Sequence, residues 1–172
     1  FDTIYHEHFS YLSLTTVKII FEFHGLEIFD VQQLPTHGGS LRVFSKHKED
    51  FSKKIEKNVF DILEFEESIG VNSLKYYENF QSKVDEIRSS FLSFLIQAKN
   101  ENKKVVGYGA AAKGNTLLNY CGIKASDLIG YVVDASPHKQ GKFLPGSRIP
   151  VYQPNIIKET SPDYIIIFPW NL

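Results

Sequence analysis

Several features are scarce or missing in this sequence, and each absence excludes a class of protein. A single cysteine, Cys121, excludes an internal disulfide and fits a reducing cytoplasm. No apolar run approaches the roughly 20 residues that a membrane-spanning helix needs, and no signal peptide is visible. The formal net charge of −1 lacks the basic excess of a nucleic-acid binder. We therefore expect a cytoplasmic protein with no nucleic-acid partner and no membrane partner.

Methionine is also absent, so the sequence has no initiator residue, and it begins abruptly with Phe1. We interpret the chain as the C-terminal portion of a longer protein. The residues that are present suffice for a packed core, because 42% are hydrophobic and 14% are aromatic. The 172 residues suit one medium domain, or one domain with an appendage.

The stretch from Lys103 to Asp134 predicts the first half of a nucleotide-binding βαβ unit. A short β-branched run at 105–106 leads into a glycine-rich turn at 107–114. A helix-forming run follows, and a second strand over 128–133 ends at Asp134. This order of elements is typical of a parallel sheet with helices packed on it.

The remaining second half of the chain fits the same architecture. Amphipathic helices are predicted over 52–69 and from Ser73 to about Asn100, and their apolar stripes are typical of packing, so we assign them no chemistry. Residues 156–160 predict a helical turn, and the apolar run 164–168 predicts a buried parallel strand. We expect an α/β fold over 52–172, a Rossmann-like three-layer sandwich with a parallel sheet.

The N-terminal part predicts an incomplete piece of another fold. A helix is expected over 14–24 with Ser13 as its N-cap, followed by strands over 26–33 and 40–45. Their short glycine-rich connection favours an antiparallel hairpin. A helix followed by a hairpin is typical of the end of a sheet that began upstream, and the charged residues 46–51 indicate a linker.

The segment Tyr5-His6-Glu7-His8 gathers groups suited to proton transfer. Histidine titrates near neutral pH, a nearby carboxylate would raise its basicity, and a tyrosine could donate to an oxyanion. Only an irregular loop could bring Tyr5, Glu7 and His8 to one substrate, because neither a strand nor a helix puts them on one face. The spacing alone favours a packed polar turn over a catalytic site. A metal site is the third possibility, since zinc needs three or four ligands.

A second candidate site is the turn His37-Gly38-Gly39-Ser40, with Arg42 shortly after it. The paired glycines expose backbone amides, Ser40 offers a hydroxyl, and the guanidinium of Arg42 suits an anion. An ordinary hairpin turn that needs positive φ explains the same residues, and the pattern favours this simpler interpretation.

The glycine-rich turn is the third candidate site, with Gly107 and Gly109 ahead of Lys113 and Asn115, and with Asp134 after the second strand. The glycines would let backbone amides approach a nucleotide or phosphate, and the helix would direct its positive N-terminus at an anion. Asp134 lies where such folds often place an acid against ribose hydroxyls. A glycine turn that merely packs the helix on the sheet accounts for the pattern equally well.

Taken together, four segments resemble the S-adenosylmethionine-dependent sugar C-methyltransferases, which act on nucleotide-linked 4-keto-deoxysugars. They are YHEHFSYLS at 5–13, HGGSLRV at 37–43, GYGAAAKG at 107–114 and PWNL at 169–172. The resemblance implies that residues 1–45 are the tail of a methyltransferase domain, 46–51 a linker, and 52–172 a Rossmann-like C-terminal domain. The zinc-binding N-terminal domain of the family and its S-adenosylmethionine-binding glycine loop are absent from this sequence, and we expect both to lie upstream.

In that family a histidine removes the proton beside the ketone of the sugar, and the enolate takes a methyl group from the sulfonium. The tyrosine-x-glutamate-histidine positions of the family motif fall on Tyr5, Glu7 and His8. The resemblance implies that His8 is the base, and that Tyr5 and Glu7 assist at the keto oxygen or orient the base.

The partners implied are a nucleotide-sugar substrate and the upstream methyltransferase domain of the same protein, without which the chain should be inactive. The alternative function is a non-catalytic module that binds NAD, coenzyme A or a nucleotide sugar.

Overall fold

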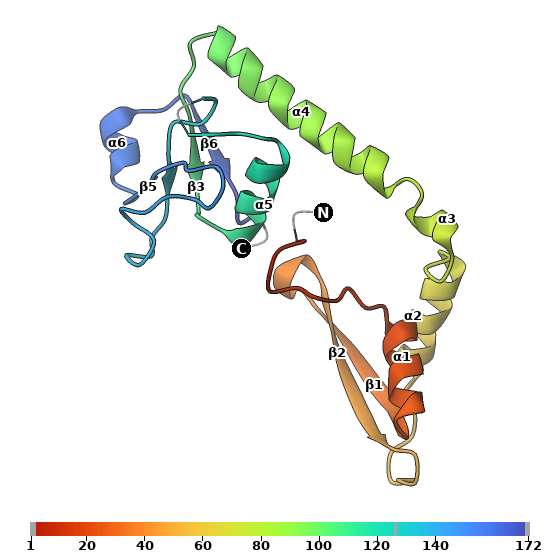
Figure 1. The fold of residues 1–172 in the computed structure, drawn as a ribbon. Coiled ribbons are helices and arrows are strands. Elements are labelled where there is room, and N and C mark those ends of the chain that lie inside the picture. The colour runs from red at the N-terminus through yellow and green to blue at the C-terminus, as the bar shows by residue number, and fades with distance from the viewer. Residues whose placement is uncertain (1–2, 126, 171–172) are drawn as a thin grey trace. The chain divides into compact units, whose positions relative to one another are not determined.

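A computed structural model of the chain describes residues 3–125 and 127–170, except for the side chain of His37. The described chain forms two compact units (Figure 1). The hairpin unit comprises residues 10–80, and the parallel-sheet unit comprises residues 3–9 together with 81–170. Within the described residues, no helix combines the length and the apolar character needed to cross a membrane.

The hairpin unit confirms the predicted helix and antiparallel hairpin. Its elements are α1 (Leu14–Phe23), β1 (Leu26–Leu34), the 3₁₀ turn η1 (Thr36–Gly38), β2 (Ser40–His47), α2 (Lys57–Ser68) and α3 (Leu74–Tyr77). Ser13 caps α1 as predicted, since its hydroxyl oxygen accepts from the backbone N–H of Thr16 at 3.1 Å. Strand β2 pairs antiparallel with β1 and continues to His47, two residues beyond its predicted end at Ser45.

The core of the hairpin unit lies between the strands and the two longer helices. Its buried side chains are Leu14, Ile28, Val31 and Val59. Glu66, which is only 8% exposed, reaches from α2 to the first turn of α1. Its carboxylate accepts from the backbone N–H groups of Leu14 and Thr15, both at 2.7 Å, and from the Thr15 hydroxyl at 2.6 Å. An acidic group from another helix thus satisfies the free amides of this helix start.

Two predicted helices differ from the observed ones. Helix α2 begins at Lys57 and not at residue 52, because the backbone N–H of Glu56 donates to the carbonyl of Phe29 at 2.8 Å and holds the chain beside β1. The long helix predicted from Ser73 to Asn100 is broken at 78–79 into α3 and α4 (Phe80–Asn100). The apolar side chains before the break are largely exposed, Leu74 by 87%, so no packing supports a continuous helix there.

The parallel-sheet unit confirms the predicted α/β fold. After α4 come β3 (Val105–Tyr108), α5 (Ala112–Tyr120), β4 (Val132–Val133), β5 (Val151–Tyr152), α6 (Ile156–Thr160) and β6 (Tyr164–Ile167). The sheet order is β5-β4-β3-β6 and every neighbouring pair is parallel. This is the order of the first strands of a Rossmann sheet. The strand predicted over 128–133 is regular only at β4, because Gly130 precedes it and weakens a strand interior.

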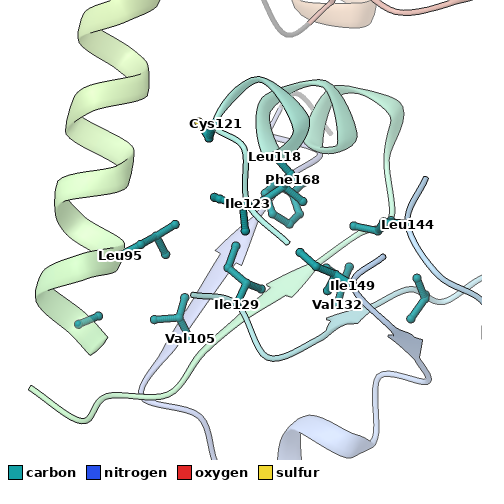
Figure 2. Close-up of a cluster of buried hydrophobic side chains, with 12 residues drawn as sticks. Leu95, Val105, Leu118, Cys121, Ile123, Ile129, Val132, Leu144, Ile149 and Phe168 are labelled. Carbon is teal, nitrogen blue, oxygen red and sulfur yellow. The ribbon is translucent and has the colours of Figure 1, made fainter. Parts of the chain in front are cut away.

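Helices α4 and α5 cover one face of this sheet, and α6 lies on the other side (Figure 1). Figure 2 shows Leu95 of α4 and Leu118 of α5 in one buried cluster with Val105 and Val132 of the sheet. The prediction of a buried strand at 164–168 is wrong in one respect. Strand β6 is parallel to β3, but it is the edge strand, and its side chains Ile165 and Ile167 are 45% and 64% exposed.

Candidate functional site

The segment that carries Tyr5 and His8 is an irregular turn in the parallel-sheet unit. The backbone N–H of His8 donates to the carbonyl of Tyr5 at 2.9 Å, which folds the segment back on itself. The two rings then lie against each other, with their centroids 4.2 Å apart and a tilt of 35°. Both residues are half-buried. The turn therefore brings together a phenol and an imidazole, as only an irregular conformation allows.

A hydrogen bond at Nδ1 indicates the tautomer of the His8 ring. Its Nδ1 lies 2.9 Å from the carbonyl oxygen of Thr3. A carbonyl only accepts, so Nδ1 must carry the hydrogen in this contact. In the neutral ring the lone pair is then on Nε2.

Glu7 is not directed at His8. Its Oε1 lies 3.8 Å from Nε2 of His6, and the two side chains are 71% and 82% exposed. The structure thus pairs Tyr5 with His8 and places Glu7 beside His6. The assisting role of Glu7 stays a prediction.

A groove of about 640 Å³ lies beside this turn, within the same unit. The turn and α5 are tied together there, because the hydroxyl of Thr116 donates to the carbonyl of Ile4 at 3.2 Å. We call this feature the α5 groove. Its lining includes Ile4, Tyr5, His6, Asn115, Thr116 and Tyr120, together with Ala110–Ala112, Asn119, Leu144 and Pro145.

The glycines of the glycine-rich turn are closely packed by the chain that follows β6. A Cβ on Gly107 would lie 2.5 Å from the ring of Phe168, and one on Gly109 would lie 2.5 Å from the ring of Pro169. Gly109 also has a φ of +88°, which glycine adopts without strain. The side of Gly107 and Gly109 on which a side chain would stand is therefore filled, whereas Ala110–Ala112 of the same turn line the α5 groove. Packing is a sufficient reason for both glycines, and substrate contact by them stays a prediction.

Asp134 is held by its own chain. Its carboxylate accepts from the backbone N–H groups of Ala110 and Ser136, both at 2.8 Å, and pairs with Lys139 at 3.1 Å. Burial of the carboxyl raises its pKa, but the hydrogen bonds from Ser136, Lys139 and Ala110 outweigh burial, so the pKa of Asp134 lies below its ordinary value. The acid predicted to face a ribose thus fixes the glycine-rich turn to the end of β4.

Lys113 and Asn115 lie on different sides of α5. Lys113 is only 6% exposed, and its Nζ lies 4.5 Å from the centroid of the Trp170 ring. Asn115 lines the α5 groove, and its Oδ1 accepts from Nδ2 of Asn119 at 3.2 Å. Of the residues predicted around the glycine-rich turn, Asn115 shares a groove with Tyr5.

The hairpin turn adopts the conformation expected of an ordinary turn with paired glycines. Gly38 and Gly39 have φ values of +87° and +125°. The Ser40 hydroxyl donates to the carbonyl of Thr36 at 2.9 Å, and Arg42 Nη1 donates to the side chain of Gln32 at 3.3 Å.

The hairpin turn also borders a groove of its own. Gly39 and Ser40 line this groove of about 580 Å³ within the hairpin unit. The predicted side-chain role of His37 falls outside the described part of the structure. Substrate binding by this turn stays a prediction.

No local pattern in the sequence singled out Phe168, Thr116 and Asn119. Their contacts, to Gly107, Ile4 and Pro145, join positions far apart in the chain. In the described part of the chain, no three His, Cys, Asp or Glu side chains gather closely enough to hold a metal ion.

Comparison with known proteins gives two matches. The family model for the C-methyltransferase C-terminal domain matches residues 35–172. The C-methyltransferase NovU of Streptomyces niveus is 37% identical over 171 residues, which cover 99% of this chain and 40% of that protein. The chain therefore spans less than half the length of this curated relative.

Proposed function

This chain belongs to the C-methyltransferase C-terminal domain family, and we propose that it is part of an S-adenosylmethionine-dependent C-methyltransferase that acts on a nucleotide-linked 4-keto-deoxysugar. The similarity to a C-methyltransferase over almost the entire chain supports the reaction class. The observation that carries the proposal is the pair formed by Tyr5 and His8, with Nδ1 of His8 bonded to the Thr3 carbonyl.

In the proposed reaction, Nε2 of His8 takes the proton from the sugar carbon next to the ketone. The electron pair of the broken C–H bond moves into the carbonyl and forms an enolate. The hydroxyl of Tyr5 donates to the enolate oxygen, and the bond from Nδ1 to Thr3 holds the ring in the tautomer that can accept. A positioned base of this kind contributes roughly 10²–10⁴-fold to a rate.

S-adenosylmethionine supplies the methyl group that the enolate carbon receives. We place the site of this cofactor in the upstream methyltransferase domain, and the match of this chain to the C-terminal domain family supports that placement. Zinc is likewise proposed only for an N-terminal domain outside this sequence. We also propose that the hairpin turn, with Gly39, Ser40 and Arg42, contacts the substrate.

Solvent exchange tests the proposal in the complete protein. A nucleotide-linked 4-keto-6-deoxyhexose in D₂O should exchange the proton beside its ketone for deuterium, even before S-adenosylmethionine is added. Addition of S-adenosylmethionine should then yield a C-methylated sugar. Product methylated on oxygen, or no exchange with any such sugar, would overturn the proposed reaction.

The alternative of a non-catalytic nucleotide-binding module receives less support. Phe168 and Pro169 pack against Gly107 and Gly109, which gives these glycines a structural reason, and Asp134 is bonded to Ala110 and Ser136. Calorimetric titration with NAD, coenzyme A and nucleotide sugars separates the two functions. Tight binding of NAD without binding of nucleotide sugars would favour the alternative.

A further inference from the structure

The carbonyl of Thr3 is shared by the two residues proposed to act on the substrate. Its oxygen accepts from the backbone N–H of Tyr5 at 3.1 Å and lies 2.9 Å from Nδ1 of His8. The backbone N–H of His8 in turn donates to the carbonyl of Tyr5 at 2.9 Å. The direction of one carbonyl therefore sets the place of the Tyr5 backbone and of the His8 ring together.

The peptide group between Ile4 and Tyr5 is held at both of its ends. Its N–H is the Tyr5 group that donates to the Thr3 carbonyl. Its carbonyl oxygen, that of Ile4, accepts from the hydroxyl of Thr116 at 3.2 Å. Because a peptide group is planar, fixing its carbonyl also fixes the direction of its N–H. The hydroxyl of Thr116 thus acts, through one peptide plane, on the carbonyl that holds the His8 ring.

The bond from Thr116 joins an exposed turn to a packed helix. Ile4 is 51% exposed, so burial of apolar surface contributes little to holding the turn in place. Helix α5 is anchored in the core by Leu118, which is fully buried. The Thr116 hydroxyl also lies 3.2 Å from the carbonyl of Ala112, one helical turn back, and this contact orients the side chain. A segment of this kind keeps a precise geometry only if a rigid element supports it.

The proposed reaction requires such precision, because a displacement of about 1 Å in a reacting group can cost roughly 100-fold in rate. We propose that Thr116 is a positioning residue, whose hydroxyl holds the turn so that the His8 ring keeps its hydrogen on Nδ1 and stays beside Tyr5. This inference rests on the proposed function, in which His8 is the base. Thr116 acts through the turn and makes no contact with the substrate.

The kinetic test uses the complete protein with Thr116→Val, which removes the hydroxyl at similar size, and with Thr116→Ser, which keeps it. Thr160→Val is the matched control, because Thr160 belongs to the same unit and donates to Ile156 of its own helix at 2.9 Å. Deuterium exchange beside the ketone of a nucleotide-linked 4-keto-6-deoxyhexose is measured at increasing sugar concentration. We expect Thr116→Val to lower kcat at least roughly tenfold and to leave KM within about twofold. Thr116→Ser and Thr160→Val should resemble wild type.

A second measurement follows the His8 ring itself and needs no catalysis. The ¹⁵N signals of the imidazole nitrogens report the tautomer of a histidine in the complete protein, and the signals that disappear in His8→Ala belong to His8. In wild type and in Thr116→Ser the hydrogen should be on Nδ1. In Thr116→Val we expect a mixture of both tautomers, because the carbonyl of Thr3 is no longer held.

A wild-type kcat in a folded Thr116→Val would overturn the inference, and so would a wild-type tautomer of His8 in that variant. A raised KM at unchanged kcat would also overturn it, since Thr116 would then contact the ligand. An equal loss of kcat in Thr160→Val would show a general effect on stability and would count against it too. Thermal unfolding shows whether each variant is folded, and Thr116→Ala takes the place of Thr116→Val if the latter is not.

Failure of the proposed function gives a different result. Wild type would then exchange no nucleotide-linked 4-ketosugar, before any substitution is made. The ¹⁵N comparison of wild type with Thr116→Val would still decide whether Thr116 holds the His8 ring.

Discussion

Glu66 shows how a single side chain joins two helices of the hairpin unit. Its carboxylate receives three hydrogen bonds at the start of α1, and the residue is 8% exposed. Truncation leaves two backbone N–H groups without their acceptor, so we predict that Glu66→Ala lowers the free energy of unfolding by about 2–3 kcal/mol. Urea unfolding followed by circular dichroism measures the loss. Glu67→Ala, at the exposed neighbouring position, should change it by less than about 0.5 kcal/mol.

The contacts of Asp134 predict a dependence of stability on pH. Its pKa in the folded chain lies below the ordinary 3.8. A lowered pKa stabilises the fold fully above the ordinary value, and this contribution is lost as pH falls through the lower, folded pKa. Fluorescence of Trp170, the one tryptophan in the sequence, should report an acid transition of the neighbouring turn below pH 3.8. Asp134→Asn should be less stable at neutral pH and should lose this pH dependence. An unchanged acid transition would contradict the assignment.

Individual contacts of this kind were only partly predictable. The cap of Ser13 follows from a residue type at a helix start, so the sequence predicted it. The contacts of Glu66 join positions more than fifty residues apart in the chain, and no local pattern encodes them. The Tyr5 and His8 pair depends on an irregular turn, for which residue spacing predicts no geometry.

Among the elements, the glycine-rich turn provides a matched pair of substitutions. Gly109 and Gly122 both have positive φ, at +88° and +71°, but only a Cβ at Gly109 would meet another group, the ring of Pro169. Gly122→Ala should cost about 1–2 kcal/mol for the backbone alone. Gly109→Ala should cost roughly 2–4 kcal/mol, since crowding adds to the backbone strain. Thermal unfolding compares the two. Equal losses would show that the packing of Pro169 against the turn is unimportant.

Helices and strands were predicted correctly where the periodicity of the sequence matches the packing in the structure. Helix α5 and strand β3 were predicted because a β-branched run, glycines and a helical run occur in order. The prediction of one long helix was wrong at 78–79, because an apolar stripe stabilises a helix only where other parts of the protein pack against it. The exposure of β6 could not be predicted either, since an edge position depends on the order of the strands in the sheet.

At the scale of the whole molecule, titration can test which part of the protein binds S-adenosylmethionine. We predict that S-adenosylmethionine does not bind the 172-residue chain, because we propose that its site lies in the upstream methyltransferase domain and not at the glycine-rich turn. The complete protein should bind it. Calorimetry on both, with circular dichroism to show that the shorter chain is folded, measures this. If the shorter chain binds S-adenosylmethionine and Gly109→Ala abolishes this binding, the cofactor site is at the glycine-rich turn and the prediction is wrong.

We propose that His8 is the base, and the nearby His6 provides the control. His6 is 82% exposed and beside Glu7, whereas His8 is bonded to Thr3 and lies against Tyr5. Deuterium exchange beside the ketone of a nucleotide-linked 4-ketosugar should be measured for the complete protein with His8→Ala and with His6→Ala. We predict that exchange and methyl transfer are abolished in His8→Ala while the sugar nucleotide still binds, and that His6→Ala retains both activities. Exchange at the wild-type rate in His8→Ala would contradict it.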